Sequence, residues 1–178
     1  PAEPVEQGDK QLEIIGLDFT PEDPFGVSLE GITLTVRGGE ILGIAGISGN
    51  GQSELTALIS GETRLATDDR IFMIGKDVGP MGAAARRKLG FAFVPEERLG
   101  RGAVPEMSLA MNAILTAHGR NVVRNGVIDR KAAEAFALEC ISEYDVRTPG
   151  PQAEAGALSG GNLQKFIVGG EIMLAPKL

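Results

Sequence analysis

The chain has 178 residues, of which 43% are hydrophobic, so it is long and apolar enough to bury a core as one domain. Its formal net charge of −7 argues against nucleic acid or anionic lipid as the main partner, because the long-range field repels both. Cys140 and His118 are the only residues of their types, which excludes an internal disulfide and leaves nothing from which to build a metal cluster or a Ser-His-Asp triad. No segment has the character of a membrane span or a signal peptide.

Strand and turn signals organise the N-terminal part of the chain. Residues 1–10, with prolines and acidic side chains, are expected to form a linker. Apolar residues predict a strand over 12–17, and the alternation of apolar residues with threonine predicts another over 32–36. The segment 20–26 between them is expected to turn, and it contains Phe25.

Strands and helices alternate through the rest of the chain. Ser108 and Asp129 are expected to cap two helices, because their side-chain oxygens accept hydrogen bonds from the free N–H groups of a first turn. The sequence Thr-Pro-Gly-Pro at 148–151 breaks the chain before the last helix. The expected strands cover 40–45, 70–75 and 91–94, and the expected helices run to about 60, over 81–89, from Ser108 to about 117, from Asp129 onward, and over 162–174.

A glycine-rich loop follows the apolar strand predicted over 40–45 and leads directly into a helix. In such a loop the successive N–H groups form a nest around phosphates, and the Ser53 hydroxyl is placed to bind Mg²⁺. The alternative is a strand-to-helix turn without a ligand, and Gln52 stands where a phosphate loop has lysine, which counts against the motif. The residues expected to bind phosphate are Gly46, Ser48, Gly49, Asn50, Gly51, Gln52, Ser53 and Glu54.

A second anion site is expected where the octapeptide 158–165, Leu-Ser-Gly-Gly-Asn-Leu-Gln-Lys, enters the last helix. Apolar residues recur at helical spacing from Leu163 to Leu174, so 159–161 lie at the helix N-terminus. Free N–H groups and the positive end of the helix dipole attract anions there, and glycines let a phosphate approach the backbone. The alternative is an ordinary turn with a capping serine.

Together the two segments resemble the ATP-binding cassette of ABC transporters, whose signature is Leu-Ser-Gly-Gly-Gln. Residues 46–55, 93–102 and 158–165 are most similar to the second cassette of the tandem ATPases that drive bacterial uptake of simple sugars and nucleosides. The resemblance runs from about Leu12 to Leu178 and implies an α/β fold. That fold has a P-loop NTPase (RecA-like) core, without its C-terminal part, an antiparallel β subdomain and a helical subdomain.

The resemblance also implies a division of the chain. A linker at 1–10 precedes a partial nucleotide-binding domain over 11–178. Within it, the β subdomain and the first part of the core cover 11–98, the helical subdomain covers 99–157, and the signature helix covers 158–178.

ATP and Mg²⁺ are the cofactors that the resemblance implies, with ATP held between the phosphate loop of one cassette and the signature of another. Phe25 is implied to stack on the adenine, with a hydrophobic loop anchor as the alternative. Glu96 stands where the family has a glutamine that contacts Mg²⁺ or the attacking water, and a competing interpretation makes 91–97 the strand that ends in catalytic carboxylates. The signature residues expected to contact the opposing ATP are Leu158, Ser159, Gly160, Gly161, Asn162 and Gln164.

The partners implied by the resemblance are a second cassette, transmembrane permease subunits and an external solute-binding protein, but no nucleic acid. The implied location is cytoplasmic, peripheral on the inner face of the bacterial plasma membrane. Because the family's catalytic Asp-Glu pair follows a segment like 174–177, the chain by itself is not expected to hydrolyse ATP. A regulatory module that binds nucleotide without turnover is the main alternative. A translation-associated ABC protein and a P-loop kinase or GTPase are disfavoured.

Two further expectations concern individual residues. Gly170 stands within the signature helix, where glycine costs about 1 kcal/mol relative to alanine. Most of a run of basic residues is expected to form a solvated face. The run comprises Arg86, Arg87, Lys88, Arg98 and Arg101.

Overall fold

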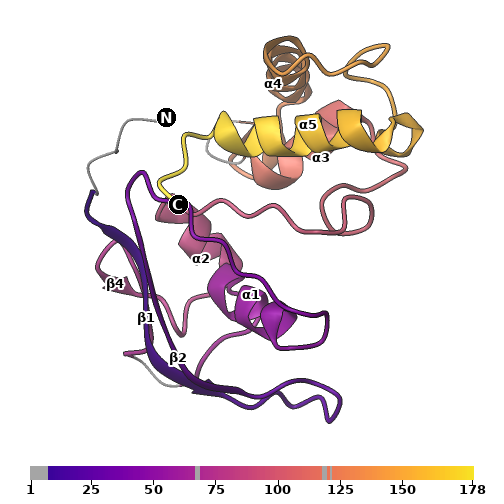
Figure 1. The fold of residues 1–178 in the computed structure, drawn as a ribbon. Helices are drawn as coiled ribbons and strands as arrows, with labels where there is room; N and C mark the ends of the chain where they lie inside the picture. Colours follow the sequence, from indigo (N-terminus) through magenta and orange to yellow (C-terminus); the bar gives the residue numbers. More distant parts are fainter. Residues whose placement is uncertain (1–7, 67–68, 118–119, 121) are drawn as a thin grey trace, which may run out of the picture. The chain divides into compact units, whose positions relative to one another are not determined.

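Four strands in the first half of the chain form an antiparallel sheet in the computed structural model, which describes residues 8–66, 69–117, 120 and 122–178 (Figure 1). Its strands stand in the order β2-β1-β3-β4. Their bounds are β1 Lys10–Phe19, β2 Leu29–Arg37, β3 Ile71–Met73 and β4 Lys76–Asp77. Residues 1–7 of the expected linker lie outside the described part, and Lys10 already belongs to β1.

Apolar residues of this sheet pack in one cluster with helix α1 (Gln52–Ser60). Ile14 and Leu17 of β1 and Ile71 of β3 are fully buried, and antiparallel pairing of β1 with both β2 and β3 holds them in register. Leu58 of α1 lies in the same apolar cluster. The second helix is α2 (Ala83–Lys88). This cluster is the core of the first of two compact units, which comprises the chain up to Phe91 together with 177–178.

Arg86 is fully buried in this unit, so it is an exception to the solvated face expected for most of the basic run. Its guanidinium donates to the backbone carbonyls of Leu58 and Ile59 at the end of α1, and to that of Val78 at 2.7 Å. Loss of hydration lowers the pKa of Arg86 to about 10, against the opposing influence of Asp77. The carbonyl oxygens at a helix C-terminus attract a cation, which explains why the charge is tolerated in the core.

Two expected strands, 40–45 and 91–94, do not form. Ile41 and Ile44, which a buried strand would cover, are 97% and 54% exposed. A strand that is apolar on both faces is stable only when its neighbours take up its N–H and C=O groups. In the part of the chain that the structure describes, neither segment takes part in a sheet.

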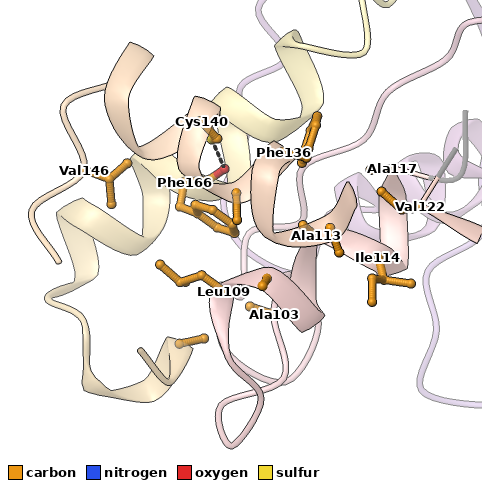
Figure 2. Packing of buried hydrophobic residues seen from close by; sticks show 14 of the residues in the cluster. Ala103, Leu109, Ala113, Ile114, Ala117, Val122, Phe136, Cys140, Val146 and Phe166 are labelled. Atoms are coloured by element: carbon orange, nitrogen blue, oxygen red, sulfur yellow. Dashed lines mark hydrogen bonds between the residues drawn. The ribbon is translucent and has the colours of Figure 1, made fainter. Parts of the chain in front are cut away.

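The second unit, residues 92–176, is built from three helices around its own apolar cluster. The helices are α3 (Leu109–Thr116), α4 (Arg130–Glu143) and α5 (Gly160–Ile172). Phe136 and Cys140 of α4 pack with Leu109 of α3 and Phe166 of α5 in this cluster (Figure 2). The small elements are the hairpin β5 (Val123–Arg124) and β6 (Val127–Ile128), and a 3₁₀ turn at Ala155–Ala157.

Capping side chains fix where α3 and α4 begin. The Ser108 hydroxyl accepts a hydrogen bond from the Met111 N–H at 3.2 Å, and the Asp129 carboxylate accepts one from the Ala132 N–H at 3.0 Å, so both expected caps are confirmed. α5 begins at Gly160 rather than at the expected position 162. None of the helices in the described residues is long and apolar enough to cross a membrane.

Candidate functional site

The glycine-rich loop of the first unit lies open to solvent at the start of α1. Residues 41–50 are all exposed. Gly49 and Gly51 have φ angles of 85° and 93°, a region that glycine adopts at little cost. Gly51 is the N-cap residue of α1, so the loop ends where the free N–H groups of a helix begin.

The side chain of Gln52 folds back onto the loop. Its amide nitrogen donates to the Ile47 carbonyl at 3.2 Å, and its amide oxygen accepts from the Asn50 N–H at 3.2 Å. A Cβ atom on Gly46 would lie 2.1 Å from the Gln52 nitrogen, so the absence of a side chain at Gly46 makes room for this contact. One N–H group of the expected phosphate nest is therefore bonded to a neutral amide.

The next two residues of the loop have different surroundings. Ser53, in the first turn of α1, is exposed, and its hydroxyl offers the hard oxygen that Mg²⁺ prefers. The Glu54 carboxylate accepts a hydrogen bond from the Val27 N–H at 3.0 Å. Sequence reasoning missed this bond, because nothing local links residues that stand 27 positions apart.

Phe25 lies in the turn between β1 and β2, with 94% of its surface exposed. Its N–H donates to the Asp23 carboxylate at 2.9 Å, and the Gly26 N–H donates to the Asp23 carbonyl at the same distance. This exposure disagrees with the alternative interpretation of Phe25 as a hydrophobic loop anchor. The ring presents both faces to solvent, as a stacking residue requires.

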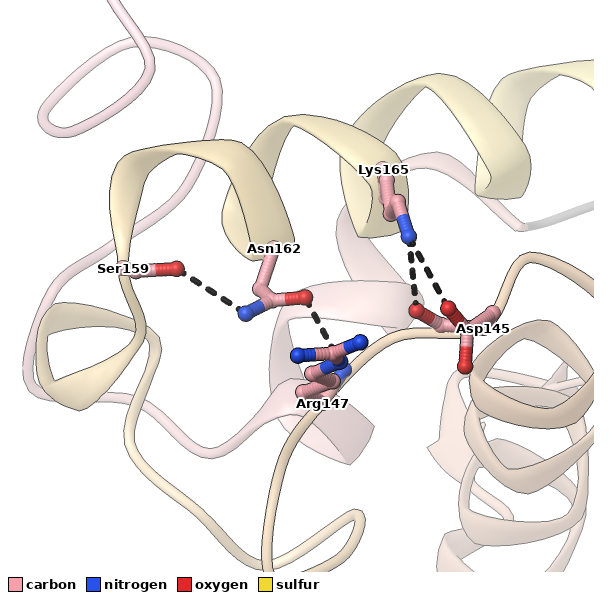
Figure 3. A network of polar contacts seen from close by, with 5 residues as sticks. All are labelled: Asp145, Arg147, Ser159, Asn162 and Lys165. Carbon is pink, nitrogen blue, oxygen red and sulfur yellow. Dashed lines mark hydrogen bonds and ion pairs between the residues drawn. The ribbon is translucent and has the colours of Figure 1, made fainter.

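Ser159 is the N-cap residue of α5 in the second unit. Its hydroxyl accepts a hydrogen bond from the Asn162 side-chain amide at 2.9 Å (Figure 3). The Asn162 oxygen in turn accepts from the Arg147 backbone N–H at 2.9 Å. Lys165 lies one turn further along and forms an ion pair of 3.3 Å with Asp145, so the helix start is tied to the segment that follows α4.

The first turn of α5 is accessible. Gly160 and Gly161 are exposed, and a Cβ atom on Gly161 would meet nothing within 4 Å. The Arg98 guanidinium carbon lies 3.5 Å from the place of a Cβ on Gly160, and its nitrogen is 3.5 Å from the Gln164 side-chain oxygen. The position of Arg98 beside the signature could not be predicted from the sequence, because it depends on the tertiary fold.

Glu96 is exposed and lies in the irregular segment after 91–94. Because that segment is not a strand, the structure gives no support to the interpretation of 91–97 as a strand ending in catalytic carboxylates. Across residues 8–66, 69–117, 120 and 122–178, no three His, Cys, Asp or Glu side chains gather as a metal cluster.

Comparison with solved structures shows the fold. A nucleotide-free ATP-binding cassette from an ABC transporter superposes with a TM-score of 0.70 at 18% identity, over 94% of this chain and 66% of that one. A dimeric cassette, MJ0796, gives a TM-score of 0.68 over 93% of this chain. The chain therefore has the α/β fold of the P-loop NTPase cassettes, as expected.

Sequence comparison shows the family. The chain is 37% identical over 171 residues to the nucleoside import ATP-binding protein NupA of Lactococcus lactis, and 35% identical over 169 residues to the ribose import ATP-binding protein RbsA 1 of Rubrobacter xylanophilus. These matches cover 96% and 95% of the chain but only 33% and 32% of the relatives, so the chain spans about a third of their length. The family model described as ABC transporter matches residues 29–178. The chain belongs to the ABC transporter family.

Proposed function

We propose that the chain is an ATP-binding cassette of an importer for a simple sugar or a nucleoside, and that it is part of the motor that drives uptake. The names of its relatives support this proposal, because they include nucleoside, guanosine and ribose import ATP-binding proteins. Within the proposed cassette, 11–98 form the β subdomain and the first part of the core, 99–157 form the helical subdomain, and 158–178 form the signature helix. The solute is selected elsewhere in the transporter.

The phosphate loop binds the phosphates of ATP and one Mg²⁺ ion in this proposal. The exposed loop, the positive φ angles of Gly49 and Gly51 and the open Ser53 hydroxyl fit a phosphate with its cation. When bound, ATP supplies a phosphoanhydride bond whose hydrolysis drives the transport cycle. Phe25 stacks on the adenine and Glu96 assists at the metal. The residues of the loop site are Gly46, Ser48, Gly49, Asn50, Gly51, Gln52, Ser53 and Glu54.

The signature contacts an ATP molecule held by a second cassette. One observation carries the proposal: the first turn of α5 is exposed, and the side chain of its N-cap residue Ser159 bonds none of the N–H groups of that turn. Free N–H groups at a helix N-terminus are suited to a terminal phosphate that arrives from outside. The residues of this contact are Leu158, Ser159, Gly160, Gly161, Asn162 and Gln164.

The partners that follow are a second cassette, permease subunits in the membrane and an external solute-binding protein. The acidic balance of the chain, with a net charge of −7, disfavours nucleic acid as a partner. The chain then works in the cytoplasm, at the inner face of the bacterial plasma membrane. Binding of ATP between two cassettes favours a closed arrangement, and hydrolysis reopens it.

A matched pair of substitutions at Gly161 tests the signature contact. The substitutions are Gly161→Glu and Gly161→Gln. Glutamate and glutamine have the same size and differ in charge. The surroundings of Gly161 leave room for the Cβ atom of either side chain. A carboxylate at a phosphate site repels its ligand, so we expect at least tenfold slower ATP hydrolysis by the assembled transporter with Glu than with Gln.

The measurement is steady-state ATPase activity of the transporter in vesicles, with circular dichroism of both variants as a control for folding. Equal activity of the two variants would show that no anion docks at the start of α5. Binding of ATP to the chain alone would be unaffected in either case, because the phosphate loop is a separate contact.

A further inference from the structure

Given that the loop site binds nucleotide, as proposed, we infer that Glu54 is a positioning residue for the adenine-stacking ring. Its backbone remains part of the loop site, but its carboxylate contacts no phosphate. Instead, it fixes the turn that carries Phe25 to the first turn of α1, so that the base and the phosphates of one nucleotide meet their binding groups at a set separation.

The bond between Glu54 and Val27 is the link between these two parts of the site. The Val27 N–H donates to the carboxylate over 3.0 Å in a partly buried position. A hydrogen bond to an ionised acceptor is roughly twice as strong as a neutral one. A carboxylate repels a triphosphate, which disfavours direct contact, whereas the bond to Val27 gives this side chain a partner that an anion suits.

Close packing is a second link between the segment that follows Phe25 and the phosphate loop. A Cβ atom on Gly51 would lie 2.7 Å from a methyl carbon of Leu29 and 3.5 Å from one of Val27. The strand that leaves the Phe25 turn therefore touches the N-cap residue of α1. Any displacement of Val27 moves this contact as well as the hydrogen bond to Glu54.

Phe25 itself has no apolar surroundings to hold it, since 94% of its surface is exposed. Its position is set by its backbone, through the bonds of its own N–H and that of Gly26 to Asp23. Because these bonds already hold the backbone of the turn, less of its conformational freedom is lost when a flat ligand stacks on the ring. The turn is thus rigid within itself, and Glu54 connects it to α1.

The test compares Glu54→Gln with Glu54→Met. Both side chains are neutral and similar in size, but only glutamine keeps an oxygen that can accept from Val27. We expect the methionine variant to bind ATP about tenfold more weakly than the glutamine variant, the scale of losing one stacked base. Both variants should bind inorganic tripolyphosphate equally, because it has no base. Calorimetric titration of the chain with each ligand measures this difference.

Two further measurements separate positioning from a general loss of structure. In a Phe25→Ala background the two Glu54 variants should bind ATP with equal affinity, because the ring that they position is gone. Hydrogen exchange without nucleotide should show the Val27 amide protected in Glu54→Gln and unprotected in Glu54→Met.

Two other outcomes overturn the role of Glu54. Equal ATP affinity of the two variants would show that the link to Val27 does not position the ring. Equally weakened tripolyphosphate binding in Glu54→Met would show that Glu54 acts on the phosphate loop itself. If neither ATP nor tripolyphosphate binds the unsubstituted chain, the proposed nucleotide function is wrong. The hydrogen-exchange measurement then still tests the bond between Val27 and Glu54.

Discussion

The Gln52 side chain occupies a backbone N–H group that a phosphate-binding loop otherwise offers to its ligand. Its amide bridges the Ile47 carbonyl and the Asn50 N–H in the free loop. A phosphate that enters the nest must displace the amide oxygen from Asn50, and the neutral side chain offers no charge in return. A net hydrogen bond is worth about 0.5–1.5 kcal/mol, so this displacement is a modest but real cost to nucleotide binding.

Replacing Gln52 with lysine should strengthen nucleotide binding. An ammonium group 4 Å from a phosphate oxygen contributes on the order of 4 kcal/mol at an effective dielectric near 20, before desolvation is subtracted. We expect Gln52→Lys to lower the dissociation constant of ATP by at least about tenfold, measured by calorimetric titration of the chain.

Gln52→Met serves as the matched control, because it removes the amide without adding charge. It should bind ATP as well as the unsubstituted chain or slightly better, since Asn50 then keeps its N–H free for phosphate. An unchanged affinity in Gln52→Lys would mean that position 52 does not face the phosphates.

At the scale of elements, two adjacent glycines of α5 have opposite surroundings. A Cβ atom on Gly169 would lie 2.5 Å from the ring of Tyr144, the C-cap residue of α4. A Cβ atom on Gly170 would meet only Phe136, at 4.0 Å, which is ordinary contact. Gly169 is therefore needed for the close approach of Tyr144 to α5, whereas Gly170 only weakens the helix.

Alanine at these two positions should change stability in opposite directions. Gly169→Ala forces the Tyr144 ring aside, and we expect a loss of about 1–3 kcal/mol in the free energy of unfolding. Gly170→Ala fits the available space and should add up to about 1 kcal/mol through helix propensity. Urea unfolding followed by circular dichroism measures both changes. A stabilising Gly169→Ala would show that α4 and α5 do not pack this closely.

At the scale of the whole molecule, local chemistry predicted elements whose stabilising groups are near in sequence. Ser108 and Asp129 each bond an N–H three residues onward, so the sequence alone locates those helix starts. The segments 40–45 and 91–94 have the composition of strands, but pairing depends on neighbours that composition does not reveal. The burial of Arg86 could not be predicted for the same reason, because the carbonyl groups of Leu58 and Ile59 that accept its hydrogen bonds are distant in sequence.

The candidate site follows the same division. The phosphate loop and the signature are continuous stretches, so their residues and their places at the starts of α1 and α5 could be predicted from the pattern. Contacts that join separate stretches could not. These are the bond from Val27 to Glu54 and the approach of Arg98 to Gly160. Both contacts depend on the tertiary fold, and the residue types of Glu54 and Arg98 do not indicate which residue each will contact.

The buried thiol of Cys140 makes the stability of the second unit depend on pH. Its thiol lies in the core between α4 and α5, and contacts the Phe166 carbonyl oxygen at 3.5 Å (Figure 2). Loss of hydration, with the nearby Glu143 and Glu139, raises the pKa of Cys140 from 9.0 to about 12. Between those values the unfolded chain loses a proton that the folded chain keeps, so this group makes stability fall as pH rises.

We therefore expect the free energy of unfolding to fall by about 1 kcal/mol more between pH 8 and pH 10 in the unsubstituted chain than in Cys140→Ala. The alanine variant starts from a lower stability because it leaves a small cavity, but it has no thiol to titrate. Tyr144, whose pKa is raised by loss of hydration and by Glu143 and Cys140, is present in both proteins, so the difference between the two slopes reports on Cys140 together with its small effect on Tyr144. Urea unfolding at the two pH values measures it. Parallel slopes would mean that solvent reaches the thiol in the folded chain and that the core between α4 and α5 is not closed around it.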